Sequence, residues 1–138
     1  MNYQKALLEK VKNIGFNDPV GPLITINEFF SGNTDDFSIA ANIDNHPTVD
    51  EFQKDLNEIQ LDNGIENILI EITDIDENQW PYSERIYIIG TIEKNELIMK
   101  LDVLEPTEVE EENSFVQSTK SKFNLQSNNS KIYSVWWD

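Results

Sequence analysis

The sequence predicts a single α+β domain built on a ferredoxin-like βαββαβ core. This core is a four-stranded antiparallel sheet with two helices on one face, and an N-terminal helix is added to it. Three observations support the prediction. Four short segments show the alternating or continuous apolar pattern that is typical of strands, and two segments between them show helical spacing. Their order matches the split βαβ arrangement. A chain of 138 residues has room for one such domain.

Residues 1–15 are predicted to form the N-terminal helix, and residues 16–36 a connector. The helix has its apolar residues at helical spacing, and Gly15 stands where a helix would end. Within the connector, residues 23–26 are predicted to form a short edge strand. A single helical turn at residues 27–30 follows. The apolar stripe of the helix is Tyr3, Leu7, Val11 and Ile14.

Residues 37–138 are predicted to form the α+β core, which begins with a strand over residues 37–43. Its apolar residues alternate along the chain, and His46-Pro47 ends it. Thr48 and Glu51 have the spacing of a capping box, so a helix is expected to begin at Val49. The alternating strand residues are Phe37, Ile39, Ala41 and Ile43. The buried stripe of the helix is Val49, Phe52, Leu56 and Ile59.

The second half of the core has three further strands and one helix. Residues 68–72 and 86–89 are nearly continuous apolar runs, as expected of interior strands. A helix is expected to begin near Glu93 and to end at Pro106, although residues 98–104 could instead form a strand. Residues 105–129 are polar and are expected to be mobile, and residues 131–138 form the last strand. The predicted apolar face of the second helix is Leu97, Ile98, Leu101 and Leu104.

Negative charge dominates the chain and is concentrated in one segment. The formal net charge is −16, and residues 16–78 hold fifteen acidic side chains against Lys54, which gives that segment −14. Such a field repels nucleic acid and anionic membranes and favours encounter with a basic surface. We therefore expect a basic protein partner, and neither nucleic acid nor membrane binding.

Few side chains with catalytic or metal-binding chemistry are present. The chain has no Cys, one His and one Arg, so a soft-metal site lacks ligands. Asp74, Asp76 and Asn78 repeat the opening of a calcium loop, but Gln79 replaces its glycine and Arg85 stands where a bidentate Glu is needed. We assign no catalytic residue, no metal site and no cofactor. The N-terminal sequence resembles neither a secretory signal nor a membrane span, so a cytoplasmic protein is expected.

A partner-binding site is predicted where acidic loops carry aromatic residues. Trp and Tyr dominate interface hot spots, and surrounding carboxylates steer a basic partner towards them. The candidate site residues are Asp35, Asp36, Asp44, Asp74, Asp76, Glu77, Trp80 and Tyr82.

Several motifs resemble those of a family of small, acidic, uncharacterised bacterial proteins. These are the acidic-Trp-Pro-Tyr-Ser loop at residues 76–83, the Leu-Glu-Pro turn at residues 104–106 and the closing Trp-Trp-Asp at residues 136–138. The resemblance extends from about residue 22 to the end of the chain and implies no activity. In size and charge the chain is also similar, in general type and not in motif, to immunity proteins that neutralise secreted bacterial toxins.

Three functions remain open at this point. The first is a non-enzymatic binding protein, most concretely an immunity-type inhibitor of a basic toxin. The second is a hydrolase that depends on carboxylates, alone or with Mg²⁺ or Ca²⁺. The third is a structural or regulatory module that associates with itself. The sequence specifies neither the partner nor the oligomeric state.

Overall fold

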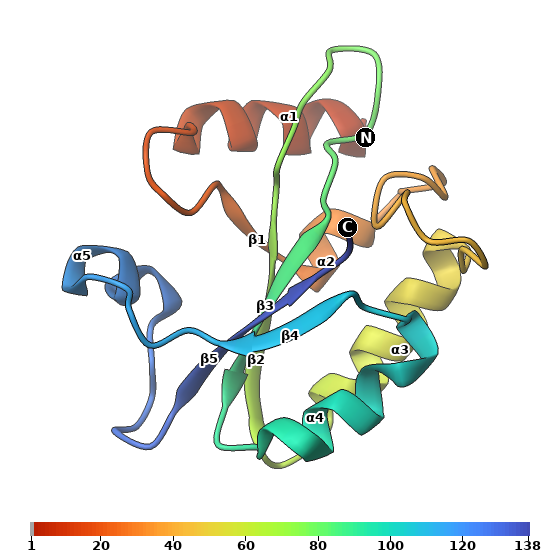
Figure 1. The fold of residues 1–138 in the computed structure, drawn as a ribbon. Helices are drawn as coiled ribbons and strands as arrows, with labels where there is room; N and C mark the ends of the chain where they lie inside the picture. Colours follow the sequence, from red (N-terminus) through yellow and green to blue (C-terminus); the bar gives the residue numbers. More distant parts are fainter. Residues whose placement is uncertain (1) are drawn as a thin grey trace.

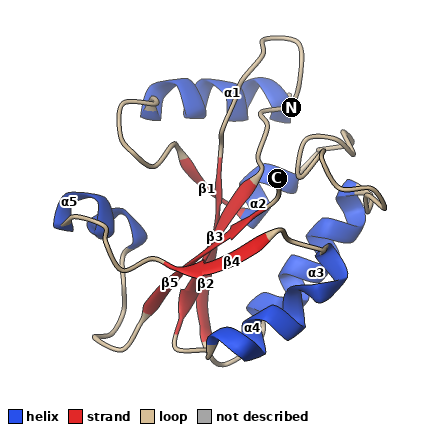
Figure 2. Cartoon of the chain, in the orientation of Figure 1, coloured by secondary structure: helices blue, strands red, loops and turns tan. Residues whose placement is uncertain are grey.

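The computed structural model describes residues 2–138 and shows an α+β fold around one five-stranded antiparallel sheet (Figures 1 and 2). The strand order is β1-β2-β3-β5-β4. The strands are β1 (Leu23–Thr25), β2 (Ile65–Glu71), β3 (Arg85–Gly90), β4 (Glu108–Glu111) and β5 (Lys131–Trp136). The helices are α1 (Tyr3–Ile14), α2 (Ile26–Phe30), α3 (Val49–Gln60), α4 (Lys94–Leu101) and α5 (Gln117–Lys120).

The topology differs from the predicted ferredoxin-like core. Both edges carry a strand that lies outside that scheme. β1 confirms the short edge strand predicted at residues 23–26 of the connector, whereas β4 lies in the segment predicted to be mobile. Because β3 and β4 are each antiparallel to β5, they run parallel to one another, and α4 connects them across β5. The prediction of an α+β fold with an antiparallel sheet is confirmed, whereas the sheet has five strands instead of four and does not match the ferredoxin-like arrangement.

The predicted strand at residues 37–43 does not form. The segment makes one isolated bridge, between Ile39 and Ser83, and Ala40 has a φ of 52°, which an extended strand cannot contain. Phe37 is 63% exposed while Ile39 and Ala40 are buried, so the apolar alternation does not correspond to one buried face. Residues 35–47 therefore form a loop between α2 and α3.

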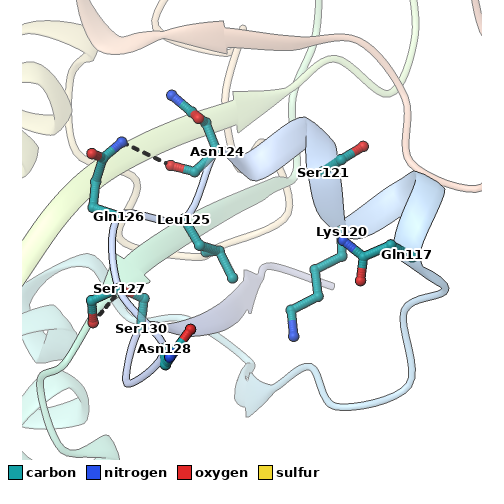
Figure 3. A pocket seen from close by; sticks show the side chains of 9 residues that line it. All are labelled: Gln117, Lys120, Ser121, Asn124, Leu125, Gln126, Ser127, Asn128 and Ser130. Carbon is teal, nitrogen blue, oxygen red and sulfur yellow. Dashed lines mark hydrogen bonds between the residues drawn. The ribbon is translucent and has the colours of Figure 1, made fainter.

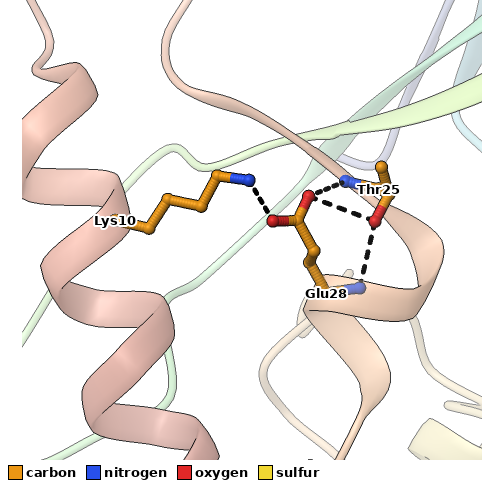
Figure 4. Close-up of polar contacts among 3 residues, drawn as sticks. All are labelled: Lys10, Thr25 and Glu28. Atoms are coloured by element: carbon orange, nitrogen blue, oxygen red, sulfur yellow. Dashed lines mark hydrogen bonds and ion pairs between the residues drawn. The ribbon is translucent and has the colours of Figure 1, made fainter.

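Local sequence signals fix the helix ends as predicted. The Gly15 amide donates to Val11 O at 3.0 Å and ends α1. The Thr48 hydroxyl accepts from the Glu51 amide at 3.2 Å and begins α3. α2 has a full capping box between Thr25 and Glu28 (Figure 4), which satisfies amides that the first turn leaves free.

α3 and α4 cover one face of the sheet, as predicted, and bury the main core there (Figures 1 and 2). Phe52 of α3 meets the Trp137 ring edge to face at 5.7 Å. The Trp137 indole N–H donates to Leu104 O at 2.8 Å, so the buried ring loses no hydrogen bond. Ile98 was predicted to be buried, but it is 42% exposed. The other core residues predicted on these two helices are Val49, Phe52, Leu56, Ile59, Leu97, Leu101 and Leu104, and all are buried.

The opposite face of the sheet is covered by the segment that contains α5. Phe123 meets the Tyr87 ring at 5.0 Å, and Phe115 stacks on Phe123 at 5.6 Å. The predicted mobility of residues 105–129 stays a prediction, but the segment contains β4, α5 and the buried Phe123. None of the helices within residues 2–138 combines the length and the apolarity needed to cross a membrane.

Candidate functional site

Two acidic loops that are far apart in the sequence are hydrogen-bonded to one another. The loops comprise residues 35–47 and residues 73–84. The Ser83 amide donates to Ser38 O, and the Ala40 amide donates to Ser83 O, both at 2.9 Å. The Ala41 amide adds a bond of 3.2 Å to the Tyr82 hydroxyl. We call the surface that carries six of the seven acidic residues of these loops the paired-loop surface. It comprises Asp35, Asp36, Asp44, Asp74, Asp76 and Glu77, and it leaves out Glu84, which directly precedes β3.

The carboxylates of the first loop also shape the local backbone. Asp35 accepts from the Phe37 amide at 3.0 Å, and Asp36 accepts from the Val49 amide at 2.9 Å. Val49 is the first residue of α3, so Asp36 satisfies an amide at that helix end, where negative charge is favoured. Asp44 is exposed and makes no hydrogen bond or ion pair within residues 2–138.

The second loop presents its carboxylates in tight turns. Asp76 accepts from the Asn78 amide at 2.9 Å, and Asp74 accepts from the Ile75 amide at the same distance. Both acids are exposed. Glu77 forms an ion pair with Lys12 of α1, which compensates its charge and ties the loop to that helix.

The two aromatic residues of the predicted site are buried to different degrees. Trp80 is only 9% exposed and belongs to the main core. Its indole N–H has no hydrogen-bond partner among the residues described. Tyr82 is half-buried, and this burial raises the pKa of its hydroxyl. Tyr82 therefore helps to join the two loops, and most of the Trp80 ring is out of reach of a partner.

His46 also has a structural contact. Its Nε2 donates to Ile39 O at 2.6 Å, within the first loop. The ring lies between Phe37 and Phe52, with centroids at 5.2 and 5.6 Å. His46 thus anchors the loop on α3.

A charged cluster that sequence analysis missed lies on the sheet face opposite α3 and α4. Glu71, Arg85 and Trp136 are neighbours across β2, β3 and β5. The Arg85 guanidinium lies 5.4 Å from the Trp136 ring centroid, within cation–π distance. Glu71 accepts from the Gly21 amide at 2.6 Å. The available signals were a glutamate inside an apolar strand and the single arginine.

Burial controls the titration of this cluster. It raises the pKa of Glu71, although the Gly21 amide and Arg85 oppose the shift. It also raises the pKa of Tyr87 to about 12, with a further contribution from the Glu71 charge. The cluster is part of a packed sheet face, and it does not line any of the pockets described below.

Two pockets lie away from the paired-loop surface. One, of about 470 Å³, is lined mostly by amide and hydroxyl side chains around α5 (Figure 3). A second, of about 270 Å³, lies between α1 and α2, where Lys10 pairs with Glu28 (Figure 4). Partial burial opposes the shift, but Lys10 and Thr25 hold the pKa of Glu28 below its usual value. Within residues 2–138, no group of three or more His, Cys, Asp or Glu is placed to hold a metal ion. The first pocket is lined by Gln117, Lys120, Ser121, Asn124, Leu125, Gln126, Ser127, Asn128 and Ser130.

Fold and surface together define a small, strongly acidic α+β protein with paired acidic loops. The model of the family described as the Uncharacterized protein YfbO family matches residues 2–135, so the chain belongs to this family. This confirms the resemblance to an uncharacterised family. A protein of Escherichia coli (strain K12), called "Uncharacterized protein YfbO", is 30% identical over 80 residues. The match covers 58% of this chain and 57% of that protein, little more than half of its length. No solved structure matches the chain.

Proposed function

We propose that the chain is a non-enzymatic binding protein that engages a basic protein partner through the paired-loop surface. The observation that carries this proposal is the hydrogen bonding between residues 38–41 and residues 82–83, which joins two acidic loops into one surface. The most concrete version is an immunity-type inhibitor that acts in the cytoplasm on a basic toxin.

The charge on this surface is largely free to act on a partner. Within residues 2–138, six ion pairs engage six acidic residues, whereas the chain has 26. Of the six charged residues on the paired-loop surface, only Glu77 is in one of these pairs. Uncompensated carboxylates on adjacent loops add their fields, which accelerates association with a basic surface.

The underlying structure supports a preorganised surface. Asp35 and Asp36 are held by backbone amides, and Tyr82 and His46 anchor the loops from below. Fixing the loops before binding reduces the conformational entropy that a partner must overcome. Each capping carboxylate uses one oxygen in these bonds, so its other oxygen can accept from a Lys or Arg.

The proposal is tested by affinity capture from the source organism, followed by reconstitution with the purified partner. The test variant is Asp44→Asn/Asp76→Asn, which removes two exposed charges. The Asn side chain at position 76 keeps an oxygen that can accept from the Asn78 amide. The matched control is Glu58→Gln/Glu96→Gln, which removes two exposed charges elsewhere, from α3 and α4. Both variants have the same net charge.

We expect a captured protein with a basic surface whose affinity falls at least about fivefold in the test variant and stays near wild type in the control. An equal loss in both variants would mean that net charge alone attracts the partner, and the paired-loop surface would then have no special role. If the only protein captured is the chain itself, the self-associating alternative replaces the proposal.

A further inference from the structure

β4 forms an open edge of the sheet and leaves backbone groups free for another strand. Within the described residues 2–138, its one neighbour is β5. The Glu112 amide donates to Ile132 O at 2.8 Å, and Glu110 lies opposite Ser134 in the same register. In an antiparallel ladder, alternate residues bond to the neighbour, so the backbone groups of Val109 and Glu111 point outward. Neither of their amides donates to a partner outside the β4–β5 ladder within residues 2–138.

A groove with an apolar floor and an acidic rim lies beside this edge. It has a volume of about 430 Å³ and lies between α4 and the first residues of β4. Ile98 was predicted to join the core, but it is 42% exposed. It lines the groove together with Pro106 and Val109. The acidic residues of the rim are Asp102, Glu105 and Glu108.

We propose that the β4 edge binds an extended partner segment in which basic and apolar residues alternate. Side chains of an added strand alternate between the two faces of the sheet. Side chains of the added strand that point to the same face as Val109 would lie on the face that α4 covers, where the exposed Ile98 can contact them. Those on the other side meet the exposed carboxylate of Glu108 and that of Glu110, which also forms an ion pair of 3.6 Å with Lys94 of α4. Strand addition of this kind takes its affinity from main-chain hydrogen bonds and its specificity from the alternating side chains.

The charge on β4 also argues against a second copy of the chain as the occupant. Three of the four residues of β4 are glutamates, so pairing two β4 edges would place like charges opposite one another. Charged edge strands are a common protection against such pairing. The same carboxylates attract a basic strand. This inference concerns a different surface from the paired loops and does not depend on the proposed function.

The test uses the full chain and a synthetic peptide, Thr-Lys-Val-Lys-Val-Lys-Thr, titrated by calorimetry at low ionic strength. A control peptide with proline in place of both valines keeps the charge but cannot supply the same backbone donors. The protein variants are Glu108→Gln/Glu110→Gln, which removes charge from the edge, and Glu58→Gln/Glu96→Gln, which removes the same charge from α3 and α4. Amide hydrogen exchange of Val109 and Glu111 reports on the edge itself.

We expect the alternating peptide to bind, with affinity reduced at least about tenfold by the prolines or by the Glu108→Gln/Glu110→Gln change. The Glu58→Gln/Glu96→Gln variant should bind like wild type, and the peptide should slow exchange at Val109 and Glu111. Equal binding of the two peptides would show attraction by charge alone and overturn the proposal. Absence of binding, or a wild-type chain that dimerises through β4, would overturn it as well.

Discussion

The Tyr82 hydroxyl accepts a hydrogen bond of 3.2 Å from the Ala41 amide, across 41 residues of sequence. Together with the bonds between Ser83 and the first loop, it makes one surface from two acidic segments. Like charges on two joined loops repel one another, which costs stability unless the loops are anchored. Anchored loops with repelling charges are expected of a surface that binds a basic partner.

Replacing Tyr82 with Phe tests this anchor. The hydroxyl lies near the surface, where water can replace part of the lost bond, so the free energy of unfolding should fall by about 0.5–1 kcal/mol. Amide exchange at Ala41 should become faster. Tyr3→Phe is the matched control, because no hydrogen bond of the Tyr3 hydroxyl occurs within residues 2–138. Unchanged exchange at Ala41 in Tyr82→Phe would show that the bond does not hold the loops.

The carboxylate of Asp36 is expected to stabilise α3. Asp36→Ala leaves the Val49 amide without its acceptor and should lower the free energy of unfolding by about 1 kcal/mol. Asp36→Asn retains an acceptor oxygen and should lose less. Chemical denaturation of both variants measures the difference. Equal losses for Ala and Asn would indicate that the charge matters and the hydrogen bond does not.

Glu71 should make the protein less stable as the pH rises through the range in which this residue titrates. Its pKa in the folded protein is raised above the reference value of 4.5, so the folded state holds the proton more tightly than the unfolded state. Stability from this group is therefore full below pH 4.5 and is lost as the pH rises through the folded pKa. Glu71→Gln should gain stability relative to wild type over that range. A constant difference between the two proteins from acid to neutral pH would contradict the assignment.

Gly21 should not tolerate a side chain. A Cβ at this position would lie 2.7 Å from Ile72 O, a backbone atom that cannot move aside easily. We expect Gly21→Ala to lower the free energy of unfolding by about 1–3 kcal/mol and to disturb the bond to Glu71. Thermal unfolding provides the measurement. A variant as stable as wild type would show that the connector moves away from β2 without loss.

Much of the fold could be predicted because its signals are local. Gly15, the pair Thr48 and Glu51, and the apolar stripes of α3 and α4 act within a few residues, and they fixed the helices correctly. The prediction of a strand at residues 37–43 failed because a period-two apolar pattern does not reveal a residue with a left-handed backbone conformation, such as Ala40. β4 was missed because three of its four residues are glutamates, so it does not show the apolar pattern of a strand. Its pairing with β5 also depends on residues that are distant in the sequence.

The candidate site could be predicted only in part. Charge and aromatic content indicated the two loops, but nothing local shows that Ser38 and Ser83 would pair their backbones. The burial of Trp80 was also beyond sequence reasoning, because a Trp-Pro pair in an acidic loop is compatible with either a core or a surface position. Glu71 and Arg85 carried a readable signal, an acid in an apolar strand and a unique arginine, whose pairing depends on strand register.

The most direct test of the paired-loop surface is the association rate constant with the purified partner, measured by stopped-flow at low and at physiological ionic strength. At low ionic strength, Asp44→Asn/Asp76→Asn should associate about fivefold more slowly than Glu58→Gln/Glu96→Gln. This difference should shrink towards physiological salt, where charges interact over only about 8 Å. Identical rate constants for the two variants at both ionic strengths would contradict the account.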